Sequence, residues 1–502
     1  MIPTILGITF LVFMLLAMSP GGIGAALRVS NGQMDQTKAA LQEAYLEDRY
    51  GLDDPPIVQY VRWLGRISPI KFGTRDRVKP SGELVRPPKE LKDPPLKDSW
   101  FKELSVPDAE RAEIALKHAT LDPADGDEIP KITAYKIAHK HYAKARAGYV
   151  VARKTLEKSL TRYGEEVGIS GLVGTDGKLD FSKLVSLQPD TSAESWGKVQ
   201  VAGLDLLRAY HNAEAARQRE VRAFIAGPYP EDGVGFSKLS LAWSDLGTAF
   251  SRSRPVKDLI LEALPVTLLL NLVALPLIYL IAVPSGMLAA RYRGSWFDIA
   301  SGACFVAFWS IPTIWAGVMA IGYLADNEQL GWFPVSGLHG NTAEAMTFLP
   351  SKGVNGWTAG YLFDTLWHVA LPVACLVYTG FAVLAKQTRA AMLDNFSQDY
   401  VRTAKAKGVS DRVVMWRHIF RNSLLPLITI FVTIFPAMLS GSIVVEMIFS
   451  IPGMGSLILE AITLRDRELI LANTFMIAIV NLLALLLADL LYAAADPRVT
   501  YD

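Results

Sequence analysis

The sequence predicts an all-α, polytopic membrane protein with six transmembrane helices and a large helical insertion outside the membrane. Of its 502 residues, 51% are hydrophobic, yet 20% are charged. The two kinds are segregated: apolar runs occupy the start and the second half of the chain, and polar residues fill 21–256. The formal net charge is only +1, which argues against a chain that binds polyanions over its whole surface.

Six apolar stretches approach the roughly 20 residues that a helix needs to cross a bilayer. Several contain proline, which membrane helices tolerate when neighbours satisfy the freed carbonyls. The first could alternatively be a secretory signal peptide, but no Lys or Arg precedes Arg28, so the positive leading region is missing. The stretches span about 2–18, 260–289, 297–324, 366–385, 424–449 and 470–494.

Basic residues in the short loops predict the orientation of the chain. The loops after the second and fourth stretches hold ten Lys or Arg, whereas the alternate loops, 325–365 and 450–469, hold only three. The ten-residue side is therefore expected to be cytoplasmic, with both termini on that side. We accordingly expect three domains: a first helix at 1–20, an external region at 21–256, and a core of five helices at 257–502.

The external region carries two long helical patterns. Residues 131–163 show apolar side chains at alternating spacings of three and four, a heptad seam of bulky and small residues. Thr191 and Glu194 have the spacing of a capping box for a second helix that would end near Phe224. An antiparallel hairpin is the economical arrangement, and it serves either as a structural element or as a docking surface for an external protein.

Residues 400–426, called the basic segment below, lie between two apolar stretches. We expect two short helices that meet at Gly408, with Ala404 and Ala406 allowing close approach and Ser410 or Asp411 capping the second helix. The second helix would end near Pro426. It would bury Val413, Val414, Ile419 and Leu424 and expose Arg412, Arg417 and Arg421. Such a helix could also lie on the lipid surface without any protein partner.

Motifs for catalysis, metal binding and nucleotide binding are absent from the sequence. The two cysteines, Cys304 and Cys375, lie in apolar runs and predict buried thiols rather than a disulfide framework. His139 and His141 are two residues apart, so on a helix they face different ways. The stretch around Lys178 lacks the glycine spacing of a phosphate loop. We therefore expect no catalytic residue, no metal and no cofactor on this chain.

The amino-acid sequence of the basic segment resembles the cytoplasmic "EAA" loop of importer-type ABC transporter permeases, in the oligopeptide, dipeptide and nickel branch. Arg402 stands where the glutamate that names the loop is found elsewhere, which is usual for this branch. The residues that carry the resemblance are Arg402, Thr403, Ala404, Lys407, Gly408, Arg417, His418, Arg421, Asn422, Ser423, Leu424, Leu425 and Pro426.

Four further stretches are similar to the same family, and together the resemblance covers about 1–67 and 242–502. They are YGLDDPPIVQYVRWLG from Tyr50, the run before Leu270, EMIFSIPGMGSLILEAITLRD from Glu446, and ADLLYAAADPR around Asp489. The family usually has an Arg-rich stretch before the first helix, so the natural start is expected to lie upstream or this anchor is lost. Residues of about 68–241 have no counterpart in the usual member.

The resemblance implies a permease subunit of the bacterial inner membrane that works by alternating access. Its implied partners are a second, homologous permease, two cytoplasmic ATPase subunits that bind the ATP, and an extracytoplasmic solute-binding protein. The loop around Gly408 would fit a cleft on an ATPase. Peptides are the central cargo of the branch, but nickel and sugars also occur, so the sequence does not identify the solute.

Glu446 and Asp489 are ionisable residues within or beside apolar spans, where such groups often have functional roles. We expect each either to line a gate or to accept hydrogen bonds between helices. Two other functions stay open. A membrane-anchored scaffold or sensor would use the external hairpin to bind a partner, and an ion-driven transporter would need an inverted repeat and more intramembrane charges.

Overall fold

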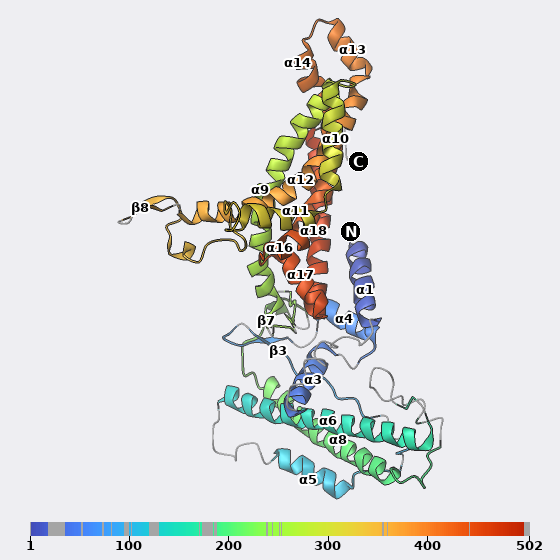
Figure 1. Ribbon diagram of the computed structural model, residues 1–502. Coiled ribbons are helices and arrows are strands. Elements are labelled where there is room, and N and C mark those ends of the chain that lie inside the picture. The colour runs from blue at the N-terminus through green and yellow to red at the C-terminus, as the bar shows by residue number, and fades with distance from the viewer. Residues whose placement is uncertain are drawn as a thin grey trace. The chain divides into compact units, whose positions relative to one another are not determined.

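A computed structural model gives the fold as two compact units (Figure 1). The membrane unit comprises Met1–Val12 and Gly247–Asp502, and the insertion unit comprises Phe13–Leu246. These packing units do not test which residues lie outside the membrane, so the external region 21–256 stays a prediction. The structure describes residues 2–18, 36–51, 54–72, 75–81, 83–94, 100–101, 103–119, 130–169, 171–172, 184, 188–236, 239–242, 244–249, 251–252, 254–353, 356–358, 360–440 and 442–495.

The membrane unit is a bundle of long helices with short strands at its loops. Its long helices are α9 (Val256–Arg291), α10 (Trp296–Ser310), α12 (Gly360–Phe396), α15 (Phe420–Ser440) and α18 (Arg467–Ala495). Shorter pieces connect them: α11 (Thr313–Ala320), α13 (Asp399–Ala406), α14 (Asp411–Val413), α16 (Ile443–Ile448) and α17 (Met454–Thr463), with 3₁₀ residues at Ala343–Ala345. Two hairpins complete it, β6–β7 (Thr248–Ala249, Arg254–Pro255) and β8–β9 (Ser351–Gly353, Gly356–Thr358).

The prediction of a mostly helical membrane protein is confirmed, but the number of six spans is not. Within the described ranges, three helices are long and apolar enough to cross a bilayer, namely α9, α12 and α18. Helix α10 and the segment Thr313–Ala325 would make a fourth if they are counted as one span. Helix α1 (Ile2–Met18) is apolar but only 17 residues long, and the expected fifth span is divided between α15 and α16.

The expected third span, 297–324, is broken in its middle. Helices α10 and α11 meet at an angle of 86°. Ile311 has extended backbone angles, φ −78° and ψ 119°, and Pro312 precedes the first residue of α11. Proline disfavours helical geometry in the residue before it and has no N–H to donate, so the chain turns here. Other prolines, including Pro276 and Pro372, are accommodated inside helices.

Helices α9 and α12 form the centre of the membrane unit through small residues. A methyl group at Gly286 would come within 2.5 Å of the carbonyl oxygen of Ala385, and one at Gly380 within 2.6 Å of Ile278. Ala282 and Ala382 are also buried. Small residues let two membrane helices approach closely and gain dispersion contacts without a hydrophobic driving force. This pair therefore forms a stiff support for the loops at its ends.

The insertion unit is built on the predicted hairpin, made of α6 (Lys131–Val167) and α8 (Trp196–Ile225). The helices are antiparallel: Tyr135 near the start of α6 bonds to Glu220 near the end of α8, and the ring of Tyr163 lies 5.6 Å from that of Trp196. The hairpin prediction is confirmed, and α6 is longer than expected, at about 55 Å for 1.5 Å per residue.

The predicted capping box at the start of α8 is wrong. Thr191 and Glu194 lie in a turn before the helix, whose N-cap is Ser195. The carboxylate of Glu166, from the end of α6, accepts hydrogen bonds from the backbone N–H groups of Glu194 at 2.8 Å and Ser195 at 3.2 Å. A neighbouring helix thus satisfies the free donors that a local side chain was expected to satisfy.

Smaller elements surround the hairpin. Helices α3 (Gln36–Tyr50), α4 (Pro56–Ile67) and α5 (Asp108–Ala119) accompany two antiparallel sheets. The first sheet has the order β1 (Ile70–Phe72), β5 (Leu239–Leu241), β4 (Val234–Phe236), and pairs Ile70 with Leu241. The second pairs β2 (Arg77–Val78) with β3 (Leu84–Val85). The first sheet thus joins a strand early in the insertion unit's sequence to two strands near its end.

Candidate functional site

The first helix of the basic segment, α13, ends as the sequence predicts. Gly408 has φ +76°, and a methyl group there would meet nothing within 4 Å, so the glycine is required by its backbone angle rather than by space. The N–H of Val409 donates to the carbonyl of Ala404, and the N–H of Gly408 donates to that of Lys405. These two bonds form a Schellman motif, which fixes the direction of the chain after α13.

The second helix differs from the prediction. Ser410 is the N-cap, but its side chain makes no capping bond. After α14, residues Val414–Ile419 form a π-helical turn that continues into α15. The helix therefore does not end near Pro426, because the wide turn lets the chain run on into the long membrane helix. The turn also changes the register, so Val413, expected to be buried, is exposed, while Val414 and Ile419 are buried as predicted.

The inner face of the basic segment packs on the ends of the two central helices. Buried side chains of the segment join Met287 and Ala290 of α9 and Met392 of α12 in one apolar cluster; those of the segment are Val401, Ala404, Val414, Met415 and Ile419. Because most of this apolar face is covered by protein, its burial does not depend on contact with lipid. A displacement of the segment would instead be transmitted to α9 and α12 through close packing.

Hydrogen bonds attach the segment to α12 as well. Asn395 donates to Ser423 Oγ at 3.1 Å and to the carbonyl of Ala391 at 2.9 Å. Ser423 donates back to the same carbonyl, and Tyr400 donates to Asn395 Oδ1 at 2.7 Å. Nothing in the sequence pattern indicated Asn395, because its partners, one in α12 and two near the opposite ends of the segment, come together only in the fold. These bonds make the base of the segment rigid.

The outer face of the segment is basic and weakly paired. Arg402 has 77% of its side chain exposed, and its distance to the still more exposed Asp399 is 3.6 Å, so this pair contributes little to stability. Trp416 is 48% exposed beside Val413. Arginine and tryptophan are enriched at the centres of protein interfaces. Helices α13 and α14 lie at one tip of the membrane unit, opposite β7 (Figure 1), where a soluble partner could reach them.

The predicted residues of the segment thus divide into two groups. Ala404 is buried against the bundle, and His418 is half-buried. The others form the exposed face or its border: Arg402, Thr403, Lys407, Gly408, Arg417, Arg421 and Pro426. Ala406, expected to allow close approach, is exposed instead. Their role in coupling stays a prediction.

A bidentate ion pair near the same end was missed by the sequence analysis. Arg389 of α12 donates to both carboxylate oxygens of Asp298 on α10, at 2.6 and 2.8 Å. Asp298 also accepts from the N–H of Gly294 at 3.0 Å, and Ser295 caps α10. The spacing Ser-x-x-Asp at the start of an apolar run was the available signal. This pair joins α10 to the helix that carries the basic segment.

Glu446 is enclosed in a network of hydrogen bonds rather than facing an open space. It is 1% exposed. Its carboxylate accepts from Thr267 at 2.9 Å and from the N–H of Ser456 at 2.9 Å, and Thr267 accepts from the N–H of Met454. The group therefore joins α9, α16 and α17. Asp489 lies on α18 with an exposed side chain. A gating or packing role for either residue stays a prediction.

Among the described residues, no group of three or more His, Cys, Asp or Glu side chains is placed to hold a metal ion. The polar side chains described in the basic segment are mostly exposed. Its chemistry is that of a protein contact: an exposed, positively charged surface on a rigid base that is continuous with membrane helices.

Comparison with known proteins agrees with this description. Residues 282–501 match the family model described as "Binding-protein-dependent transport system inner membrane component". The oligopeptide transport system permease protein AppB of Bacillus subtilis is 38% identical over 265 residues, 52% of this chain and 78% of the relative. The dipeptide transport system permease protein DppB of Alkalihalophilus pseudofirmus is 33% identical, over 57% of this chain and 86% of the relative. The permease YejB of Escherichia coli O157:H7 is 33% identical, over 51% of this chain and 68% of the relative.

Proposed function

Because the chain belongs to the family of binding-protein-dependent transport system inner membrane components, we propose that it imports short peptides by a movement that the basic segment transmits. The chain is a membrane-embedded permease subunit of an ATP-driven importer. It is not itself an enzyme, since ATP hydrolysis in this class lies on separate subunits. The peptide cargo is supported by relatives whose names specify oligopeptide or dipeptide transport.

The observation that carries the coupling role is the combination of an exposed basic face and a buried apolar base in one short segment. The Schellman motif at Gly408 fixes the shape of the exposed part. The cluster with Met287 and Met392 joins its base to α9 and α12. A partner that moves this face therefore moves the ends of the central helices, which is what alternating access requires of the membrane subunit.

The partners follow from the family and from the charge pattern. ATPase and substrate-binding components are associated with this permease class. In our proposal, two ATPase subunits dock on the basic segment, a homologous permease completes the membrane path, and a binding protein delivers the cargo from outside. The ten-to-three asymmetry of basic loop residues supports a cytoplasmic position for the segment and for both termini. ATP is bound by the partner subunits and not by this chain.

Proline substitution at Gly408 tests the coupling role. Proline fixes φ near −65° and removes the N–H, whereas Gly408 needs φ +76° and donates to Lys405. Gly408→Pro should abolish both ATPase association and ATP-dependent uptake of a labelled tripeptide into proteoliposomes. The matched control is Gly294→Pro in the α9–α10 turn, where φ is +77° and the N–H donates to Asp298.

The control should also lose one local N–H donor and suffer similar backbone strain while keeping ATPase association. Two results would contradict the proposal. One is a Gly408→Pro protein that still binds the ATPases and takes up peptide. The other is an equal loss of ATPase association in both variants, which would indicate a general effect of distorting loops at this end.

A further inference from the structure

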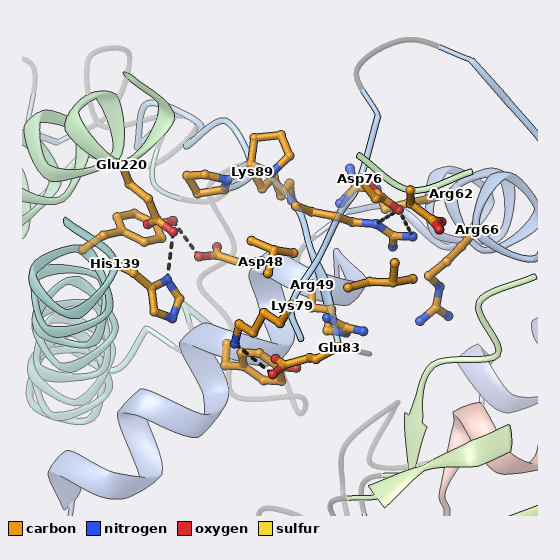
Figure 2. A pocket seen from close by; sticks show the side chains of 18 of the residues that line it. Asp48, Arg49, Arg62, Arg66, Asp76, Lys79, Glu83, Lys89, His139 and Glu220 are labelled. Carbon is orange, nitrogen blue, oxygen red and sulfur yellow. Dashed lines mark hydrogen bonds and ion pairs between the residues drawn. The ribbon is translucent and has the colours of Figure 1, made fainter. Parts of the chain in front are cut away.

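The insertion unit contains a cavity of about 620 Å³, within the range of ligand-binding pockets. Its walls come mainly from α3, α4, α6, α8 and the β2–β3 hairpin, all inside one unit (Figure 2). The side chains in it are strongly charged, and cationic residues outnumber acidic ones. The charged residues that line it are Arg49, Arg62, Arg66, Lys71, Lys79, Arg86, Lys89 and Arg146, with Asp48, Asp76, Glu83, Glu220 and Asp232.

One face of α6 forms a continuous wall of the cavity. Tyr135, His139, Tyr142 and Arg146 all line it, at spacings of four, three and four residues, which place side chains along one side of a helix. Each of these side chains carries a polar group, and three of them also carry an aromatic ring. The wall therefore offers hydrogen bonds at separate points along an extended ligand.

Glu220 provides a negative site at one end of this wall. It is 2% exposed. Its Oε1 atom accepts from Tyr135 at 3.3 Å and lies 2.8 Å from His139 Nδ1. Its Oε2 atom is buried and has no hydrogen-bond partner among the described residues. A buried carboxylate oxygen without a donor is costly, and a cationic donor in the cavity would satisfy it.

Arg146 provides a positive site further along the same wall. It is 3% exposed, and it donates through Nη2 to Glu47 at 2.8 Å and through Nε to Asp48 at 3.1 Å. Both carboxylates also have other donors: Arg153 bonds to Glu47 and Tyr142 to Asp48. The remaining group, Nη1, is buried without an acceptor in the described part of the chain. It is available for an anion.

The separation of the two sites limits the length of the ligand. His139, which contacts Glu220, precedes Arg146 by seven residues, and α6 rises by about 10 Å over that distance. An extended peptide residue covers about 3.3–3.6 Å. A ligand with opposite charges at its ends would therefore span the two sites with about three residues. Figure 2 shows Glu220 and His139 together at one side, with Arg49, Arg62 and Arg66 displaced toward the other.

We propose that this cavity binds short linear peptides with free termini, the ammonium group at Glu220 and the carboxylate at Arg146. The unpartnered oxygen of Glu220 and nitrogen of Arg146, and the distance along α6 between them, favour a small molecule with separated positive and negative ends. The choice of a peptide among such molecules rests on the proposed cargo. The insertion unit would thus hold its own peptide site, separate from the membrane path formed by the bundle.

Calorimetric titration of the full chain in nanodiscs, without ATPase subunits, tests the proposal. The probes are trialanine, its N-acetylated form and its C-terminal amide. Trialanine should bind, and removing either terminal charge should weaken binding by roughly tenfold or more, since a hydrogen bond to a charged group contributes about 1.5–3 kcal/mol. Equal binding of all three probes, or no binding of trialanine at millimolar concentration, would overturn it.

A substitution at Glu220 tests, in the same assay, whether this residue binds the ammonium group. Glu220→Gln keeps the size of the side chain and should weaken trialanine binding at least tenfold. N-acetylated trialanine, which has no ammonium group, should bind the variant and the natural chain equally. Glu214→Gln on the same helix is the matched control, because Glu214 pairs with Arg217 and does not line the cavity. If both variants bind alike, Glu220 is not the ammonium site. Since no uptake is measured, this result is independent of the coupling test.

Discussion

Arginine has opposite roles in the two units. In the basic segment, Arg402 is exposed, and its ion pair with the exposed Asp399 has a separation of 3.6 Å. In the insertion unit, Arg146 is buried between two carboxylates, with Arg153 beside it. A buried charge needs partners of its own chain, since an unpaired one would cost several kcal/mol. An exposed charge contributes little to the free energy of folding and is available to bind another protein. Exposure and pairing, rather than residue type, thus separate an arginine that supports the fold from one that is accessible to another protein.

The first prediction tests the structural side of this contrast and has the largest expected effect. Arg146→Leu should destabilise the insertion unit by about 3–5 kcal/mol, because Glu47 and Asp48 would lose a buried cationic partner. Hydrogen exchange of the α6 and α8 amides in the full chain measures this change. Lys144→Leu, an exposed position on the same helix, is the control and should change exchange little. Similar protection in both variants would mean that the buried pair is dispensable.

A smaller effect is expected at Glu157, also on α6. Burial raises the pKa of Glu157 to about 7, while Arg153 lies 4.0 Å away and only partly offsets this. Because the folded pKa lies above the unfolded one, its contribution to stability is complete below about pH 4.5 and is lost as pH rises toward 7. The loss is about 3 kcal/mol, because each of the roughly 2.5 pKa units between 4.5 and about 7 corresponds to 1.36 kcal/mol.

Glu157→Gln should therefore remove this fall and make the insertion unit more stable than the natural chain above pH 7. Hydrogen exchange protection of α6 at pH 5 and pH 8, compared between the two proteins, gives the measurement once the chemical exchange rates are corrected for pH. If the natural chain and the variant lose protection in parallel, the burial of this carboxylate has no cost and the interpretation is wrong.

The smallest effect on stability is expected at Arg417, in the exposed face of the basic segment. Arg417→Ala should change the free energy of unfolding by less than about 0.5 kcal/mol, yet weaken association with the ATPase subunits in a pull-down. Lys257→Ala, an exposed cation at the opposite end of α9, should leave that association unchanged. An Arg417→Ala protein that associates normally would indicate that the exposed basic face is not the docking surface.

The sequence predicted features that depend on local chemistry. The turn at Gly408 and the long hairpin of α6 and α8 are both present, because a glycine that permits positive φ and a sustained apolar seam are visible in the chain itself. The burial of Val413 and the helix end near Pro426 were wrong, since a π-turn shifts the register without a sequence marker. The cap from Glu166 and the break before Pro312 depend on tertiary partners.

The cavity of the insertion unit could not be predicted for a different reason. Its lining comes from residues between 41 and 242, and no short motif joins them. Tyr135 and Tyr142 were interpreted as part of a packing seam, and His139 was considered only together with His141. Tyr135 and Tyr142 do pack, and they also line the cavity. A helix face that borders a cavity has the same periodicity as one that is covered by a neighbour, so pattern alone does not separate them.

The π-turn at Val414–Ile419 sets the angular position of the basic face. One residue of an α-helix corresponds to a rotation of about 100° around its axis, and a π-turn accommodates one residue more than a regular helix. The side chains of Arg412 and Arg417 therefore face their present direction only because this extra residue is present. The position of this extra residue along the helix therefore sets the direction in which the exposed arginines point relative to the side chains of α15.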